Sequence, residues 1–136
     1  MHAGVRRIVF LALIAAFANF YGCGGGGSSD SGTALPAKTL RWEPPTSYVD
    51  ATSMDPVTEL DRYEVYVNES GSFTDTDTAL AVVSAVDKAT HTVTTSFNLA
   101  NIGPPLTVGP KYYVSMRAVA LTGLKSDFSP PVSFSF

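Results

Sequence analysis

The fold is decided by a stretch in which apolar and polar side chains alternate, residues 111–118, Lys-Tyr-Tyr-Val-Ser-Met-Arg-Ala. The even-numbered side chains, from Tyr112 to Ala118, are apolar, and most of the odd-numbered ones are polar. Successive side chains of a β-strand point to opposite faces, so this pattern predicts a strand with one packed face and one wet face. The same period of two recurs in residues 39–42, 62–67, 92–99 and 132–136. One-sided alternation is typical of antiparallel sheets, and two such sheets that cover each other form an all-β sandwich.

Four segments are similar, in order and in spacing, to a fibronectin type III domain. They are residues 40–45 (LRWEPP), 60–66 (LDRYEVY), 106–112 (LTVGPKY) and 112–118 (YYVSMRA). The resemblance covers residues 38–136 and implies an immunoglobulin-like antiparallel β-sandwich. The loop at residues 121–125 holds no Arg-Gly-Asp, so integrin-type adhesion is not carried over.

The resemblance assigns structural roles to three aromatic residues. Trp42 is expected between the sheets, and Tyr63 is expected to face the core. Tyr112 is expected to form a tyrosine corner, its hydroxyl bonded to the backbone within residues 101–109.

Two parts of the expected domain are short or ambiguous. Only residues 33–37 remain for a first strand, which is therefore expected to be short or absent. Residues 78–89 are rich in Ala and Val; we interpret residues 79–85 as a strand, and a short helix remains the alternative.

The N-terminal residues 1–22 have the pattern of a signal peptide. Arg6 and Arg7 precede an uncharged apolar run, residues 8–18, which is too short to cross a bilayer as a helix. Two cleavage sites compete. Ala-Phe-Ala at residues 16–18 fits ordinary signal peptidase, whereas Phe-Tyr-Gly-Cys at residues 20–23 resembles the lipobox of bacterial lipoproteins.

The glycine- and serine-rich stretch after Cys23 favours the lipobox, because lipoproteins commonly carry such a tether. Cys23 is then the site of lipid attachment, and residues 23–37 form a tether that spans about 20 Å. Resemblance to lipoproteins without Asp after the cysteine implies the outer membrane. Cleavage at residue 18 would instead give a periplasmic or secreted protein.

Charge and cysteine content exclude several classes of protein. Beyond residue 22 the chain has seven Lys and Arg against twelve Asp and Glu, a net charge of −5. This balance disfavours nucleic acid as a partner, because phosphate binding needs clustered cations. Cys23 is the only cysteine, so no internal disulfide can form and the core must be hydrophobic.

The sequence offers little for catalysis or metal binding. His91 is the only histidine after residue 22, and we interpret it as a solvated residue at a strand end. Asp75 and Asp77 lack the spacing of a calcium loop and predict a polar hairpin loop. Asn68 precedes a turn at Gly71. We therefore expect neither an enzyme nor a metal or other cofactor.

The leading functional expectation is a non-catalytic protein-interaction or scaffold module, anchored by lipid at the bacterial cell envelope and contacting a protein there. This step rests on analogy with the fold family. The alternative is a carbohydrate-binding β-sandwich that uses surface aromatics such as Tyr48, Tyr66 and Tyr113.

The strand parity also predicts a possible contact surface. In the family arrangement the third and sixth strands are antiparallel neighbours, so Tyr66 should point outward near Tyr113. Glu64 should then lie within reach of an arginine, and Arg117 should share this face. We favour the interpretation that the same residues are cross-strand pairs that only stabilise the sheet, because aromatic pairs are common in sheets that bind nothing.

Overall fold

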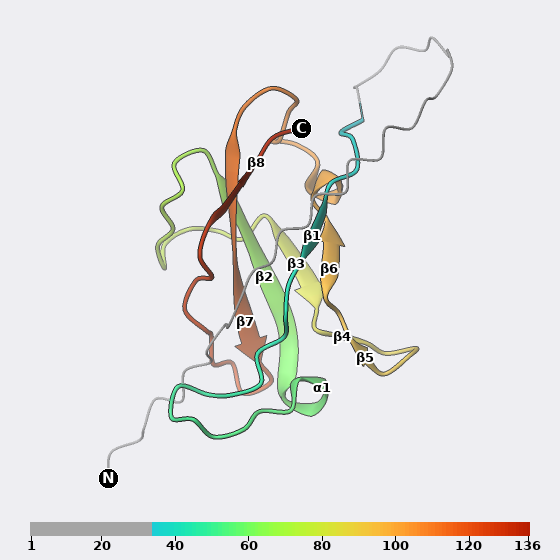
Figure 1. Ribbon diagram of the computed structural model, residues 1–136, viewed down its shortest axis with the longest axis vertical. Coiled ribbons are helices and arrows are strands. Elements are labelled where there is room, and N and C mark those ends of the chain that lie inside the picture. The colour runs from blue at the N-terminus through green and yellow to red at the C-terminus, as the bar shows by residue number, and fades with distance from the viewer. Residues whose placement is uncertain (1–33) are drawn as a thin grey trace.

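The computed structural model describes residues 34–136; the predictions for the signal peptide, Cys23 and most of the tether concern residues outside this range. The described part is an all-β, antiparallel structure (Figure 1). Its elements are β1 (Thr39–Arg41), α1 (Pro56–Glu59), β2 (Leu60–Asn68), β3 (Ala81–Ser84), β4 (Val86–Asp87), β5 (Thr92–Val93), β6 (Ser96–Asn98), the 3₁₀ helix η1 (Leu99–Ile102), β7 (Tyr112–Ala120) and β8 (Val132–Phe134).

A four-stranded sheet in the order β3-β2-β7-β8 forms one layer. Its centre is the antiparallel pair of β2 and β7, nine residues each, which run side by side along the molecule in Figure 1. Both strands are rich in Val and Tyr, whose branched or aromatic side chains pack well on a pleated surface. This pairing is the one that the sequence predicted for these two segments.

The short pair β1-β6 is a separate sheet whose Leu40 shares one buried core with the four-stranded sheet, and β4 and β5 form a separate hairpin. Trp42, just after β1, contacts Tyr63 of β2 edge to face, with 5.0 Å between ring centroids. Trp42 is 3% exposed and Tyr63 is fully buried, as expected of core residues. Burial raises the pKa of Tyr63 to about 12.

The predicted tyrosine corner is confirmed. Tyr112 is 6% exposed, and its hydroxyl accepts a hydrogen bond from the backbone N–H of Thr107 at 3.0 Å. The bond joins the start of β7 to the segment that precedes it, within the expected range of residues 101–109.

The ambiguous segment is a strand, β3, and the helical alternative is wrong. Within residues 34–38 no strand precedes β1, in accord with a first strand that is short or absent. Residues 92–99, predicted as one strand, are divided between β5 and β6. The division arises because the chain changes partners: Thr94 donates to Ala85 O, whereas Thr95 O accepts from Trp42 N.

The two ends of the described chain lie at one pole of the molecule, and three loops lie at the other (Figure 1). At the terminal pole Lys38 Nζ bonds Ser135 O, and Gly109 N donates to Phe136 O at 3.4 Å. The opposite end, called here the loop pole, consists of residues 44–59, the β4-β5 turn and residues 121–124. Leu121 N donates to Glu59 O at 2.9 Å, which ties two of these loops together.

Candidate functional site

The predicted contact surface on β2 and β7 is covered by another part of the chain. Tyr66 is only 4% exposed and Glu64 only 6%, so the expectation that both point into solvent is wrong. Strand parity gave their direction correctly, since both lie on the face opposite Tyr63. The cover consists of residues 125–131, called here the cover segment, which join β7 to β8.

Serine side chains hold the cover segment along β7. Ser126 N donates to Ala118 O and Ser129 N to Met116 O, each at 2.9 Å. In return, Ala118 N donates to Ser126 Oγ at 2.8 Å and Met116 N to Ser129 Oγ at 2.9 Å. The serine hydroxyls thus take the place of carbonyl groups in the ladder, and β7 keeps its bonds beside an irregular neighbour. Periodicity could not reveal this pairing, because the segment has no alternating pattern.

An aromatic cluster closes the outer face. The Phe128 ring contacts Tyr66 edge to face, with centroids 4.9 Å apart, and stacks on Phe73 at 5.8 Å. The guanidinium of Arg117 lies 4.7 Å from the centroid of Phe128, within cation–π range. Phe73 and Phe128 are half-buried, so this cluster is a lid of packed rings over Tyr66.

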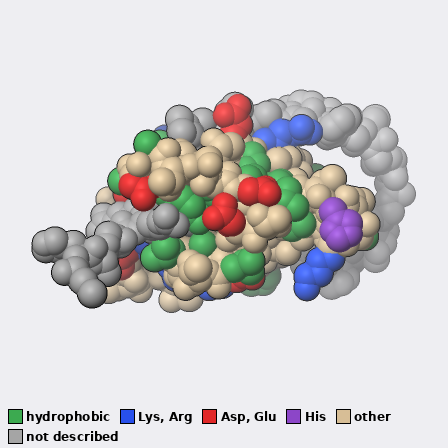
Figure 2. Space-filling model, turned by 90° about the horizontal axis from the view of Figure 1, so that it is seen from below, with side chains coloured by type: hydrophobic (Ala, Val, Ile, Leu, Met, Phe, Trp, Pro, Cys, Tyr) green, Lys and Arg blue, Asp and Glu red, His purple; other side chains and the backbone are tan. Residues whose placement is uncertain are grey.

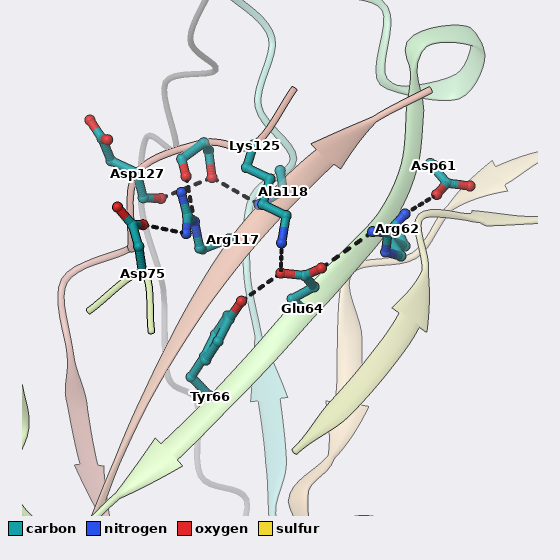
Figure 3. A network of polar contacts seen from close by, with 10 residues as sticks. Asp61, Arg62, Glu64, Tyr66, Asp75, Arg117, Ala118, Lys125 and Asp127 are labelled. Atoms are coloured by element: carbon teal, nitrogen blue, oxygen red, sulfur yellow. Dashed lines mark hydrogen bonds and ion pairs between the residues drawn. The ribbon is translucent and has the colours of Figure 1, made fainter. Parts of the chain in front are cut away.

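Glu64 is the centre of a polar network on the same outer face (Figure 3). Tyr66 Oη donates to Glu64 Oε2 at 2.5 Å, and Lys125 Nζ, at the start of the cover segment, donates to the same oxygen at 3.1 Å. Arg62 binds Glu64 Oε1 at 3.3 Å, which confirms the predicted contact with an arginine. Both oxygens of the carboxylate thus accept hydrogen bonds from side chains of the domain.

The network sets the ionisation of both partners. Burial alone would raise the pKa of Glu64, but hydrogen bonds from Tyr66 and Lys125 and the charges of Lys125 and Arg62 hold it below its ordinary value. For Tyr66, burial together with the adjacent carboxylate raises the pKa to about 12. Glu64 is therefore a carboxylate near neutral pH, with its two oxygens turned to internal donors.

Tyr113 lies on the same face as Tyr66, as predicted, but it is a diagonal neighbour and not the direct cross-strand partner. The register pairs Tyr66 with Ser115 and Tyr113 with Asn68, two residues further along β2. The Tyr113 ring lies under Lys111 Nζ at 5.3 Å, and against Gly71, where a Cβ would come within 3.2 Å of the ring. Asn68 Oδ1 accepts from the Gly71 N–H at 2.8 Å, so this segment forms the predicted turn.

Arg117 connects the outer face to the loop after β2. Its Nε donates to Ser126 O at 2.7 Å, and its guanidinium binds Asp75 at 2.8 Å. Asp77 accepts from Thr74 N at 2.6 Å. The two aspartates thus have partners inside the domain, and residues 34–136 contain no group of three His, Cys, Asp or Glu able to hold a metal. His91 is exposed in the β4-β5 turn at φ +53°, as a solvated residue.

Two of the three aromatics suggested for carbohydrate binding are unable to stack on a sugar. Tyr48 is 6% exposed and packs in the core, where its hydroxyl donates to Glu59 Oε1 at 3.1 Å. Tyr66 is covered by Phe128. Only Tyr113 keeps a half-exposed ring, so no flat aromatic platform is formed by this set.

The exposed aliphatic side chains of the loop pole are the surface that sequence reasoning missed. Val49 is 55%, Val57 39% and Leu121 65% exposed. Glu59 connects their loops, because its carboxylate accepts from Tyr48 and its carbonyl accepts from the Leu121 amide. Figure 2 looks onto this end and shows hydrophobic and acidic side chains side by side. The sequence held one signal for the local structure that carries Val57, the Asp-Pro pair at residues 55–56. This pair begins α1, because Asp55 caps the helix by accepting from Val57 N at 3.0 Å.

Comparisons with models of known families, with curated proteins and with solved structures gave no match for this chain. No helix within residues 34–136 is long and apolar enough to cross a membrane.

Proposed function

We propose that this chain is an exported bacterial lipoprotein, anchored through Cys23 at the cell envelope, whose fibronectin type III-like sandwich contacts another envelope protein without catalysis. The observed pairing of β2 with β7, the facing pair β1-β6 and the tyrosine corner at Tyr112 support the fold family. The signal peptide pattern, the lipobox and the tether in the sequence support the anchor.

The observation that carries the proposal is the position of the chain ends relative to the loops. The described chain begins and ends at the terminal pole (Figure 1), so a tether before residue 34 leaves from that pole. The loop pole then points away from the membrane. It presents Val49, Val57 and Leu121, aliphatic side chains that the domain leaves in water. Exposed apolar side chains rimmed by polar ones are typical of protein contact surfaces.

The composition of the loop pole favours a protein partner with basic residues. Asp50, Asp55 and Asp61 are exposed, and the first two lie within two residues of Val49 and Val57 in the sequence. Complementary charge at the rim accelerates association, whereas the apolar centre provides the contact. The outer face of β2 and β7 does not compete for this role, because its rings and charges bind each other.

Site-specific photo-cross-linking in the intact envelope tests the contact. A photoreactive amino acid at position 57 or 121 should give an adduct with one envelope protein, and a second change, Val49→Asp, should diminish it. Position 82 is the matched control, because Val82 is 61% exposed and belongs to β3, outside the segments that form the loop pole. Equal adducts from position 82, or none from positions 57 and 121, would contradict the proposal.

Membrane fractionation tests the anchor separately. Wild-type protein should be found in the membrane fraction with a diacylglyceryl group on Cys23, and Cys23→Ala should release it into the soluble fraction. A mature N-terminus at Asn19 would show that the alternative cleavage site is used and that the protein carries no lipid.

A further inference from the structure

A cleft of about 950 Å³ opens at the terminal pole, away from the contact surface proposed above. One wall is the entering chain, including Ala34, Leu35 and Ala37. The other wall is η1 with the segment that follows it, including Leu106 and Val108. The tyrosine corner fixes this second wall, because Tyr112 binds the Thr107 amide.

The lining of the cleft is suited to an uncharged, flexible hydrocarbon. Aliphatic side chains predominate, with amide and hydroxyl groups from Asn98, Asn101 and Thr107, and no described residue that lines the cleft carries a charge. Its volume falls within the roughly 300–1,000 Å³ of ordinary ligand pockets. Val108 is 55% exposed at the wall, an apolar side chain left in water unless a ligand covers it.

The position of Ala34, where the described chain begins, points to one possible ligand for the cleft. Ala34 lines the cleft, and Cys23 precedes it by only eleven residues in the sequence. Eleven residues reach at most about 40 Å when extended and about 17–20 Å on average as a flexible tether. A lipid on Cys23 is thus held within reach of the cleft at a high effective concentration.

We propose that the cleft binds a fatty acyl chain and that its occupant is one of the chains attached to Cys23. This inference rests on the proposed lipoprotein identity. An acyl chain bound in the cleft holds the terminal pole close to the lipidated Cys23. The cleft also shields this acyl chain from water whenever the protein is outside a bilayer. Because stable anchoring takes two hydrophobic chains, occupancy of the cleft also weakens membrane attachment.

Photoactivatable fatty acid, incorporated by the cells into the full-length protein, tests the occupant. We expect intramolecular adducts on residues 34–37 and 103–108, mapped by mass spectrometry. In Val108→Glu they should fall at least tenfold. Val82→Glu is the matched control, since Val82 is similarly exposed and does not line the cleft, and should leave them unchanged. Adducts confined to membrane lipid would overturn the proposal.

A second arm separates the cleft from the anchor. The chain from residue 23 with Cys23→Ala, given the same photoactivatable fatty acid free in buffer, should be labelled on the same residues. No labelling there would overturn acyl binding by the cleft. A third outcome is that this variant is labelled, whereas the acylated wild-type protein shows no intramolecular adduct. The cleft would then bind free fatty acid only, and the assigned occupant would be wrong. Absence of any lipid on wild-type Cys23 would instead refute the lipoprotein proposal, while this arm still tests the cleft.

Discussion

The two faces of the β2-β7 pair are built from the same strands by different means. The inner face is apolar and nearly dry, with Tyr63, Val65, Val114 and Met116 all fully buried. The outer face buries Tyr66 and Glu64 almost as deeply, but by other means. The Phe128 ring packs on Tyr66, and the Glu64 carboxylate accepts hydrogen bonds from three donors. The inner face meets a second sheet, whereas the outer face meets the cover segment, which follows β7 in the sequence.

The comparison shows that the direction of a side chain and its exposure are separate properties. Strand period fixes the direction, because consecutive residues alternate between faces. Exposure depends on what else lies over that face, and here an irregular segment with Phe128 covers residues that a two-layer sandwich would leave in water. Polar side chains beneath such a cover are stable only when each finds a partner, as Glu64 does.

The largest expected effect is on the inner face. Trp42→Ala should lower the free energy of unfolding by about 3–5 kcal/mol, because it removes a buried ring and leaves a cavity against Tyr63. Small domains have total stabilities of about 5–15 kcal/mol, so this variant is near the limit of folding. Urea denaturation followed by far-ultraviolet circular dichroism measures the change. Val82→Ala, at an exposed position, should stay within about 0.5 kcal/mol of wild type.

On the outer face the matched change is Phe128→Ala. It removes the edge contact with Tyr66, the stacking on Phe73 and the cation–π contact with Arg117, and should cost about 1–3 kcal/mol. The same denaturation experiment measures it. A loss as small as that of Val82→Ala would mean that the cover segment does not pack on the sheet, and the comparison between the two faces would fail.

The sequence predicted what depends on local pattern or on a single well-defined interaction. The strands around Tyr63 and Tyr112, the burial of Trp42 and the hydroxyl bond of Tyr112 follow from alternation and from the family resemblance. The covered state of Tyr66 could not be predicted in this way, because Phe128 is surrounded by Ser, Asp and Pro with no period. The exact register of Tyr66 against β7 could not be predicted either, because a shift of two residues preserves the face and changes the direct cross-strand neighbour.

Tyr112→Phe tests the hydrogen bond that holds the segment after η1 to the start of β7. Loss of the hydroxyl removes its hydrogen bonds with the Thr107 amide and the Thr107 hydroxyl, so we expect a loss of about 1 kcal/mol with little change in packing. Thermal unfolding measures this variant against wild type. If unfolding is unchanged while hydrogen exchange at the Thr107 amide is also unchanged, the bond is not formed in solution.

The smallest effect concerns pH. The pKa of Glu64 is held below its ordinary value of 4.5 in the folded protein, so its ionised form stabilises the fold above the unfolded-state pKa. This contribution should be lost as the pH falls from about 4.5 through the lower folded-state pKa. Glu64→Gln should therefore be less stable than wild type at pH 7, and the difference should shrink toward acid. A constant difference across this range would show that the carboxylate charge is not what matters.

The central claim is that the outer face of β2 and β7 is a packed layer and not a surface for partners. Nuclear Overhauser effects between the rings of Phe128 and Tyr66, in the chain from residue 23 with Cys23→Ala, test it most directly. With the ring centroids 4.9 Å apart, strong cross-peaks between the two rings are expected. A Tyr66 ring that shows cross-peaks only to neighbours within its own sheet, together with ready quenching of its fluorescence by a soluble quencher, would contradict the account.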